Sequence, residues 1–132
     1  MPIPVVFIPV INRADLLLRA IHSLNYHIDK IVILNNGTDT GVIDILAQLE
    51  QEIPNLIVHH SKTNLGVSAS WNKALRDYSS EDYILICGSD ICFAPNDLRL
   101  IDEGMRRHPE YVIRPGNHGH SFFGITPECI EK

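Results

Sequence analysis

The chain has 132 residues, of which 45% are hydrophobic and 20% charged, so it has the length and composition of one ordinary globular domain. Its formal charge of -5, from 16 acidic against 11 basic residues, excludes a general binder of nucleic acid or anionic membranes, because no basic excess exists to neutralise phosphates. Three cysteines without C-x-x-C spacing and the lack of a ~20-residue apolar stretch favour a cytoplasmic protein without a transmembrane segment. The cysteines lie in or next to apolar stretches and are expected to be buried.

The first half of the chain alternates apolar runs with amphipathic stretches. Residues 5–8 are continuously apolar, which predicts a strand buried on both faces. Asn12 is a residue type that caps helices, and apolar residues recur at helical spacing up to Leu24, so a helix is expected to begin at Asn12. A second strand is expected at 31–34, before the turn-forming sequence Asn35-Asn36-Gly37. A helix across 42–49 and a third strand at 56–58 follow.

The second half continues the alternation. A third helix is expected from about residue 67 to 78, and the apolar run 83–87 predicts a fourth strand. Pro95-Asn96-Asp97 is expected to begin a fourth helix, which extends to Met105. Residues 111–113 predict a fifth strand, and 121–125 a sixth, antiparallel one. This order predicts an α/β fold, a mostly parallel sheet with helices on both faces, as in an α/β/α sandwich.

Polar segments follow the expected strands at residues 12–13, 35–39, 63–66 and 88–90. Because the carboxyl ends of parallel strands meet at one edge of a sheet, these segments predict a ligand site there. Simpler interpretations remain open beside this one. Asn12, Asp39 and Asp90 are also residue types that cap helices and turns, and Arg13 also suits a solvent-exposed position.

The same segments carry longer patterns. Residues 8–13 are I-P-V-I-N-R, 33–39 are I-L-N-N-G-T-D, 64–75 are N-L-G-V-S-A-S-W-N-K-A-L, and 83–90 are Y-I-L-I-C-G-S-D. In this order they resemble four motifs of family 2 glycosyltransferases, namely P-V-Y-N-R, V-V-D-N-G-S-x-D, N-x-G-x-x-x-x-x-N-x-G-L and Y-I-x-x-L-D-x-D. The resemblance covers residues 4 to about 96 and implies a GT-A-like, Rossmann-like fold. It implies one nucleotide-sugar-binding domain over residues 1–132, with the acceptor-binding half largely missing.

The resemblance implies a hexosyltransferase-type enzyme that transfers a sugar from a nucleotide-diphosphate sugar to a hydroxyl of a sugar or glycan acceptor, with inversion. It implies Mn²⁺ or Mg²⁺ bound by Asp90, the match to the last aspartate of the family's D-x-D. Gly88 stands where the family has the first aspartate, and Asn35 stands where an aspartate usually binds the nucleobase. The nucleotide-sugar-binding residues that the resemblance implies are Pro9, Asn12, Arg13, Asn35, Asn36, Asp39, Asn64, Gly66, Asn72 and Ser89.

The resemblance implies a catalytic carboxylate C-terminal to the four motifs. Near the end of the chain only Glu128 and Glu131 carry a carboxylate, and neither can be assigned as the catalytic base. The alternative is a non-catalytic nucleotide-sugar-binding or interaction module of the same fold. Response-regulator-like, flavodoxin-like and sugar nucleotidyltransferase folds are disfavoured, because the first strand is followed by neither an acidic pair nor a glycine-rich loop.

A homo-oligomer would supply the missing walls of the site. His118 and His120 share a face of an extended segment, but two histidines alone are weak evidence for a metal site.

Overall fold

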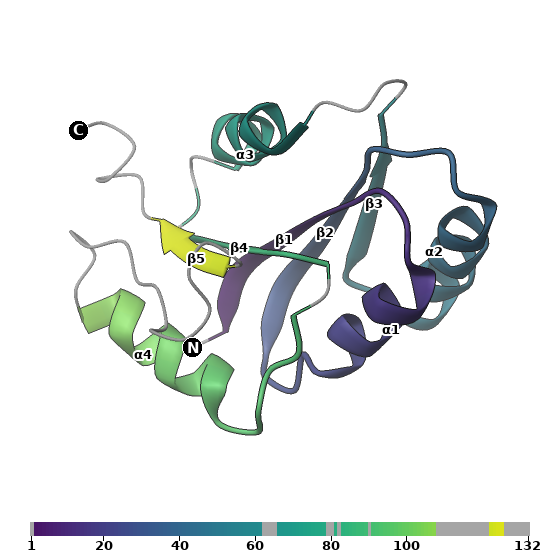
Figure 1. Cartoon of the computed structure of the whole chain (residues 1–132). Helices are drawn as coiled ribbons and strands as arrows, with labels where there is room; N and C mark the ends of the chain where they lie inside the picture. The colour runs from purple at the N-terminus through teal and green to yellow at the C-terminus, as the bar shows by residue number, and fades with distance from the viewer. Residues whose placement is uncertain are drawn as a thin grey trace.

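The computed structural model describes residues 2–61, 66–78, 81, 83–89, 91–107 and 122–125. Strands and helices alternate along the chain (Figure 1). In chain order they are β1 (Ile3–Val10), α1 (Ala14–His22), β2 (Ile28–Asn35), α2 (Thr40–Glu52), β3 (Leu56–His60), α3 (Gly66–Asp77), β4 (Ile84–Cys87), α4 (Asp97–Arg107) and β5 (Phe122–Ile125).

The five strands form one sheet in the order β3-β2-β1-β4-β5. β1 to β4 are parallel, and β5 pairs with β4 in the antiparallel direction. The predicted α/β fold, with a mostly parallel sheet between helices, is therefore confirmed, as is the antiparallel strand expected at 121–125. The strand expected at 111–113 lies outside the described residues.

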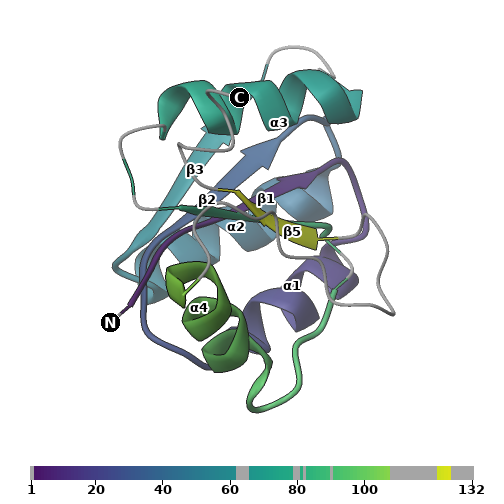
Figure 2. The ribbon, with the colours of Figure 1, turned by 90° about the vertical axis from the view of Figure 1, so that its left-hand side faces the viewer.

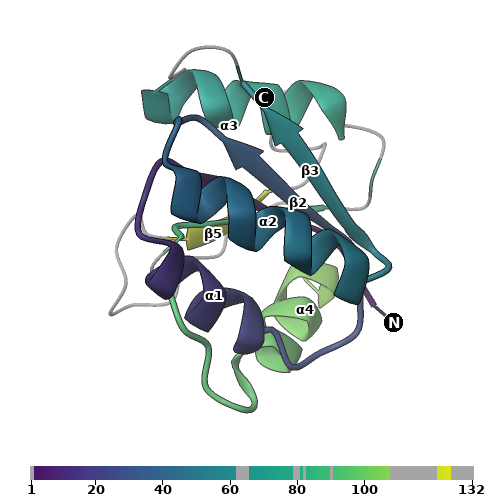
Figure 3. The same cartoon turned by 90° about the vertical axis from the view of Figure 1, so that its right-hand side faces the viewer.

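The positions of the helices follow from the strand order. The steps from β1 to β2 and from β2 to β3 run in one direction across the sheet, so right-handed crossovers put α1 and α2 on the same face. The step from β3 to β4 returns past β2 and β1, and the same handedness then puts α3 on the opposite face. Figure 2 and Figure 3 show α3 alone on one side of the sheet, with α1, α2 and α4 on the other.

Each face of the sheet has its own apolar core. The smaller core lies under α3 and includes Phe7, Leu34 and Ala74, all 1% exposed or less. The larger core receives side chains from three helices: Leu17 and Ile21 of α1, Val42, Leu46 and Leu49 of α2, and Leu98, Ile101 and Met105 of α4. No helix in the described part of the chain has the length and apolar character needed to span a bilayer.

The beginning of α1 differs from the sequence-based expectation. Asn12 was expected to cap this helix, but Arg13 occupies the N-cap position, in the left-handed region at φ 64° and ψ 64°, and no side chain caps the helix. The Arg13 carbonyl accepts the amides of Leu16 and Leu17, both at 3.1 Å. The expectation for Asn12 is therefore wrong, because the turn after β1 delays the helix by one residue. The helix also ends at His22, so Leu24 lies beyond it.

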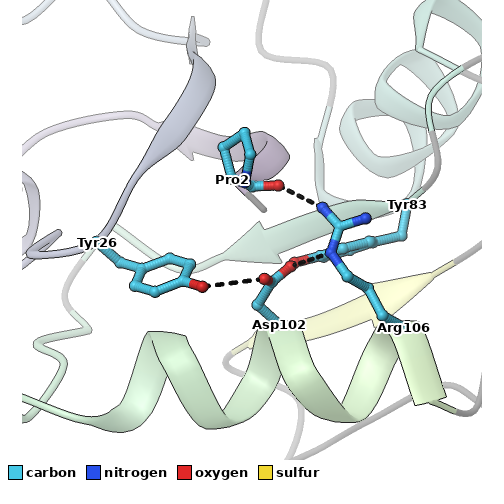
Figure 4. Close-up of polar contacts among 5 residues, drawn as sticks. All are labelled: Pro2, Tyr26, Tyr83, Asp102 and Arg106. Carbon is cyan, nitrogen blue, oxygen red and sulfur yellow. Dashed lines mark hydrogen bonds and ion pairs between the residues drawn. The ribbon is translucent and has the colours of Figure 1, made fainter.

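A polar network joins α4 to the amino edge of the sheet (Figure 4). Asp102 is 2% exposed, and its carboxylate accepts hydrogen bonds from Tyr83 Oη at 2.5 Å, Tyr26 Oη at 3.1 Å and Arg106 Nε at 2.9 Å. Arg106 also donates to the carbonyl of Pro2. Pro2, Tyr26 and Tyr83 precede β1, β2 and β4, so one buried carboxylate and one arginine hold the starts of three strands. We call these five residues the Asp102 network.

Candidate functional site

The strand order reverses between β1 and β4, and in open parallel sheets ligands bind beyond the carboxyl ends of the strands at such a point. The pairing between β1 and β4 ends at Phe7 and Ile86, whereas β1 stays paired with β2 as far as Val10 and Asn35. Within the described strands, the last residues of β1 therefore pair with β2 and not with β4. This edge of the sheet is the candidate functional site.

Pro9 fits this one-sided pairing. The Val10 carbonyl accepts the amide of Asn36 at 2.8 Å, so the backbone of Val10 faces β2 and that of Pro9 faces β4. Proline has no amide proton to give to a strand ladder. At Pro9 the ladder with β4 has already ended, and the proline therefore removes no hydrogen bond from the centre of the sheet.

Asn35 ends β2 and is 1% exposed. Its Oδ1 accepts the amide of Gly37 at 3.1 Å, and its Nδ2 lies 3.2 Å from His60 Nδ1, at the end of β3. Its own carbonyl accepts the amide of Ser61 at 2.9 Å. Both ends of the buried amide are thus hydrogen-bonded within the protein, as burial of an amide requires.

Asn36 points to the opposite face, because successive residues of an extended chain alternate. Its Nδ2 donates to Ser70 Oγ of α3 at 2.8 Å, and the two residues are 5% and 0% exposed. Its Oδ1 is buried and has no hydrogen-bond partner among the described residues. An unpaired buried acceptor is costly, so a donor from outside the described residues would stabilise this oxygen.

The turn after Asn36 is tightly packed and leads directly into α2. A Cβ atom on Gly37 would lie 2.4 Å from the carbonyl oxygen of Ile11, so only glycine fits between the loops that follow β1 and β2. Asp39 is the N-cap of α2, and its Oδ1 accepts the amide of Val42 at 3.1 Å. This contact matches the simpler interpretation of Asp39 as a local cap.

Arg13 and Asp15 form an exposed two-point ion pair beside this edge, with Nε–Oδ1 and Nη2–Oδ2 distances of 3.1 and 3.0 Å. The hydrogen bond from Arg13 lowers the pKa of the Asp15 carboxyl, and Asp15 in turn raises the pKa of Arg13. The guanidinium is thus held beside the end of β1 by a partner that water screens.

The remaining candidates are spread along the other strands. Gly66 is the first residue of α3, Asn72 is exposed on that helix, and Ser89 is half-buried after β4. Asn64 and Asp90 lie outside the described residues, as do His118, His120, Glu128 and Glu131.

The described residues at this edge offer amides and hydroxyls rather than a cluster of carboxylates. Within the described ranges, no group of three or more His, Cys, Asp or Glu side chains could hold a metal ion. Asp39 already uses its carboxylate as a helix cap. The described donor set therefore does not fit a divalent cation by itself, and Asp90 remains the predicted ligand.

Two residues of this edge were not expected from the sequence to matter. His60 is exposed at the end of β3, and its ring contacts the buried Asn35. Ser70 carried no signal except its position one helical turn after Gly66. The pairing of β3 with β2 brings His60 to the site, and the face of α3 that packs on the sheet brings Ser70 there.

The chain thus has the class of open, mostly parallel α/β sheet that binds ligands at the carboxyl edge where its strand order reverses. The family model described as "Glycosyl transferase family 2" matches residues 5–124. The chain therefore belongs to glycosyltransferase family 2. A comparison of the sequence with curated proteins finds no match.

Solved structures share the fold. The mannosyltransferase PcManGT from Pyrobaculum calidifontis, in complex with GDP-Man and Mn²⁺, aligns with a TM-score of 0.76 at 17% identity, over 98% of this chain and 46% of that one. S. aureus TarS with UDP-GlcNAc aligns at 0.64 and 20% identity, over 81% and 32%. GalNAc-T7 with UDP, GalNAc and Mn²⁺ aligns at 0.59 and 11% identity, over 67% and 18%. The chain thus spans less than half the length of these structures.

Proposed function

We propose that this chain is the donor-binding part of a glycosyltransferase that moves a sugar from a nucleotide-diphosphate sugar to a hydroxyl of a sugar or glycan acceptor. The observation that carries the proposal is the pair of hydrogen-bonded side-chain amides, Asn35 and Asn36, at the end of β2. They lie at the carboxyl edge of a sheet whose strand order reverses between the neighbouring β1 and β4. Membership of family 2 over residues 5–124 supports it, and the complexes of PcManGT and TarS with nucleotide sugars agree with it.

In this proposal the loops after β1 and β2 hold the nucleotide. Pro9 leaves the β4 side of its strand open, Asn12 and Arg13 lie at the end of β1, and the turn at Asn35 and Asn36 forms the wall beside them. The Arg13 guanidinium would exchange its exposed partner Asp15 for a phosphate oxygen. The unpaired Oδ1 of Asn36 would accept a hydroxyl or N–H of the donor.

The proposal also includes donor-binding residues that do not belong to the loops after β1 and β2. Gly66 and Asn72 would contribute from α3, Asn64 from the sequence just before this helix, and Ser89 from the residues after β4. Asp39 would act through the helix that it caps rather than by touching the ligand. Asp90 would bind Mn²⁺ or Mg²⁺, which supplies charge neutralisation of the diphosphate leaving group when bound.

The reaction needs a hydroxyl of the acceptor to attack the anomeric carbon while the bond to the diphosphate breaks. Attack from the opposite side inverts the anomeric centre, and the hydroxyl proton passes to a base that we do not assign. The acceptor side would come from further protein, either more of the same polypeptide or a second copy. We place the protein in the cytoplasm, because three cysteines without C-x-x-C spacing favour a reducing compartment.

Calorimetric titration with UDP, GDP and dTDP, each with and without Mn²⁺, tests the proposal. Binding of one nucleotide that strengthens with Mn²⁺ is the expected result, and Asp90→Ala should remove the metal effect. Asp29→Ala is the matched control, because Asp29 is an exposed carboxylate at the start of β2, on the opposite edge of the sheet.

The outcomes separate the candidate functions. Binding of none of the three nucleotides by the folded protein would refute the donor site. The protein could also bind a nucleotide but neither hydrolyse nor transfer the sugar of the donor, even when an acceptor-binding region is fused to it or added. This result would favour the non-catalytic nucleotide-sugar-binding module instead. Binding that Asp90→Ala leaves unchanged would remove Asp90 from the metal site.

A further inference from the structure

The Asn35–His60 contact bears on which side chain meets the ligand. Asn35 and His60 are register partners at the ends of β2 and β3, and they are the last pair at the carboxyl edge. Asn35 is 1% exposed and both ends of its amide are occupied, whereas His60 is exposed. A ligand that lies on this edge can therefore reach the imidazole, but it cannot reach the amide without displacing the turn.

The backbone fixes the direction of the Asn35 amide. The N–H of Gly37 is a donor and needs an oxygen, so the atom 3.1 Å from it is Oδ1. The other end of the amide is then Nδ2, a donor, and it lies 3.2 Å from His60 Nδ1. A hydrogen bond here requires Nδ1 to be the acceptor. The neutral ring of His60 must therefore carry its proton on Nε2, the nitrogen that faces away from Asn35.

We propose that His60 is a ligand-binding residue of this site, whose Nε2–H donates to a carbonyl oxygen of the nucleobase. The proposal rests on the proposed function, because it requires a nucleotide at this edge. Asn35 is then a positioning residue that fixes the tautomer of His60. It does not contact the base, in contrast to the role that the resemblance implied for this position.

The location suits the base rather than the diphosphate. Neighbouring strands lie about 4.8 Å apart, so β3 lies about 10 Å from β1, on the side away from β4. A diphosphate beside the end of β1 would leave the nucleoside extended over β2 and β3. Guanine, cytosine, uracil and thymine all carry a ring carbonyl, whereas adenine carries none. The site should therefore discriminate against ADP.

Two substitutions separate the two nitrogens of the ring. In His60→Gln the side-chain amide N reaches about as far as Nε2, so the donor toward the ligand is kept. In His60→Asn the amide oxygen takes the place of Nδ1, so the contact with Asn35 is kept but the outward donor is lost. We expect His60→Asn and His60→Ala to weaken binding of the preferred nucleoside diphosphate about tenfold, and His60→Gln to retain most of it.

The matched control is His59→Ala, because His59 precedes His60 on β3 but contacts Tyr78 under α3, on the other face of the sheet. It should bind nucleotide as the parent chain does. Because His60 is exposed at the end of an edge strand, all three of its variants are expected to fold, and circular dichroism checks this.

Long-range ¹H–¹⁵N spectra of the ligand-free protein, at about pH 8, give a second readout. The Nε2–H tautomer of His60 is expected, with a shift of that signal on nucleotide binding. The Nδ1–H tautomer, ADP binding as tight as UDP, GDP and dTDP, or retention of affinity in His60→Asn but not in His60→Gln would each overturn the inference alone. Failure of every nucleotide to bind would overturn the proposed function, and the inference with it.

Discussion

The carbonyl oxygen of Ile11 lies where a side chain on Gly37 would have to begin, 2.4 Å from a Cβ atom built there. The contact joins the loops after β1 and β2, which are the two loops that we propose to hold the nucleotide. The two backbone atoms of Ile11, its carbonyl oxygen at 2.4 Å and carbonyl carbon at 3.2 Å, cannot move aside as the end of a flexible side chain can. The turn can therefore accept another residue only by moving the end of β1.

Gly37→Ala should accordingly lower both stability and nucleotide affinity. We expect a loss of about 1–3 kcal/mol in the free energy of unfolding, the usual cost of forced overpacking, measured by urea denaturation. Gly41→Ala is the control, since its Cβ would meet no backbone atom but the side-chain carboxylate of Asp39 at 3.1 Å and Ala14 Cβ at 3.8 Å, and a helix favours alanine. Equal effects of the two substitutions would contradict the assignment of the Ile11 contact.

The hydrogen bond between Asn36 and Ser70 should couple the β2 turn to α3. Ser70→Ala removes the acceptor and leaves a buried amide unpaired, with an expected cost of about 1–3 kcal/mol. In a double-mutant cycle, Asn36→Ala combined with Ser70→Ala should cost less than the sum of the single substitutions. Simple additivity would show that the contact contributes no energy of its own.

The Asp102 network should be a main source of stability at the other edge of the sheet. Asp102→Ala leaves Tyr83, Tyr26 and Arg106 without their common acceptor, and we expect a loss of about 3–5 kcal/mol. Glu103→Ala is the control, because its ion pair with Arg99 is about half exposed and should change stability by less than about 0.5 kcal/mol. A melting temperature in Asp102→Ala close to that of the control would refute this role.

Alkaline pH should destabilise the protein through Tyr83 and Cys87. Burial, followed by the hydrogen bond to Asp102, raises the pKa of Tyr83, and burial raises the pKa of the Cys87 thiol. Above about pH 9 the unfolded chain loses these protons while the folded chain keeps them. The unfolded state then binds fewer protons, so stability is complete below this range and falls as pH rises.

The slope of this decline should reach about 1.4 kcal/mol per pH unit for each such group. Tyr83→Phe should lower stability at neutral pH, through the lost bond to Asp102, but make the alkaline limb less steep. Urea denaturation at a series of pH values measures both effects. An unchanged slope in Tyr83→Phe would mean that the ionisation of Tyr83 is not linked to unfolding.

The two described cysteines should differ in reactivity. Cys87 is buried and Cys92 is exposed, so the expectation that the cysteines are all buried is wrong for Cys92. Iodoacetamide should alkylate Cys92 in the native protein and Cys87 only after unfolding. Fragment-ion mass spectrometry distinguishes them on their shared tryptic peptide. Rapid native labelling of Cys87 would contradict its position at the end of β4.

The fold was predictable because its signals are local. Continuous apolar runs marked β1 to β4, and the turn-forming sequence after Leu34 marked the end of β2. The start of α1 was not predictable in this way, because a left-handed Arg13 held by Asp15 leaves no pattern in the sequence. Asn12 was therefore given a cap position that it does not occupy.

The site was less predictable, because its contacts depend on how elements pair. Asn35 and His60 meet only in one register of β2 and β3, and a slip by one residue would turn them to opposite faces. Asp102 did leave a signal, since it occupies an apolar-stripe position next to Ile101 and one turn before Met105 and Arg106. A charged residue in such a stripe indicates a buried partner elsewhere in the chain.

The Asp102 network and the candidate site lie at opposite ends of the same strands. β1 has 8 residues, so the two ends are separated by about 26 Å. Substitutions at such a distance usually have additive effects on stability. Loops at the carboxyl edge can therefore change during evolution or in a designed library. Substitutions that create new specificities usually lower stability, and the distant amino edge continues to stabilise the fold.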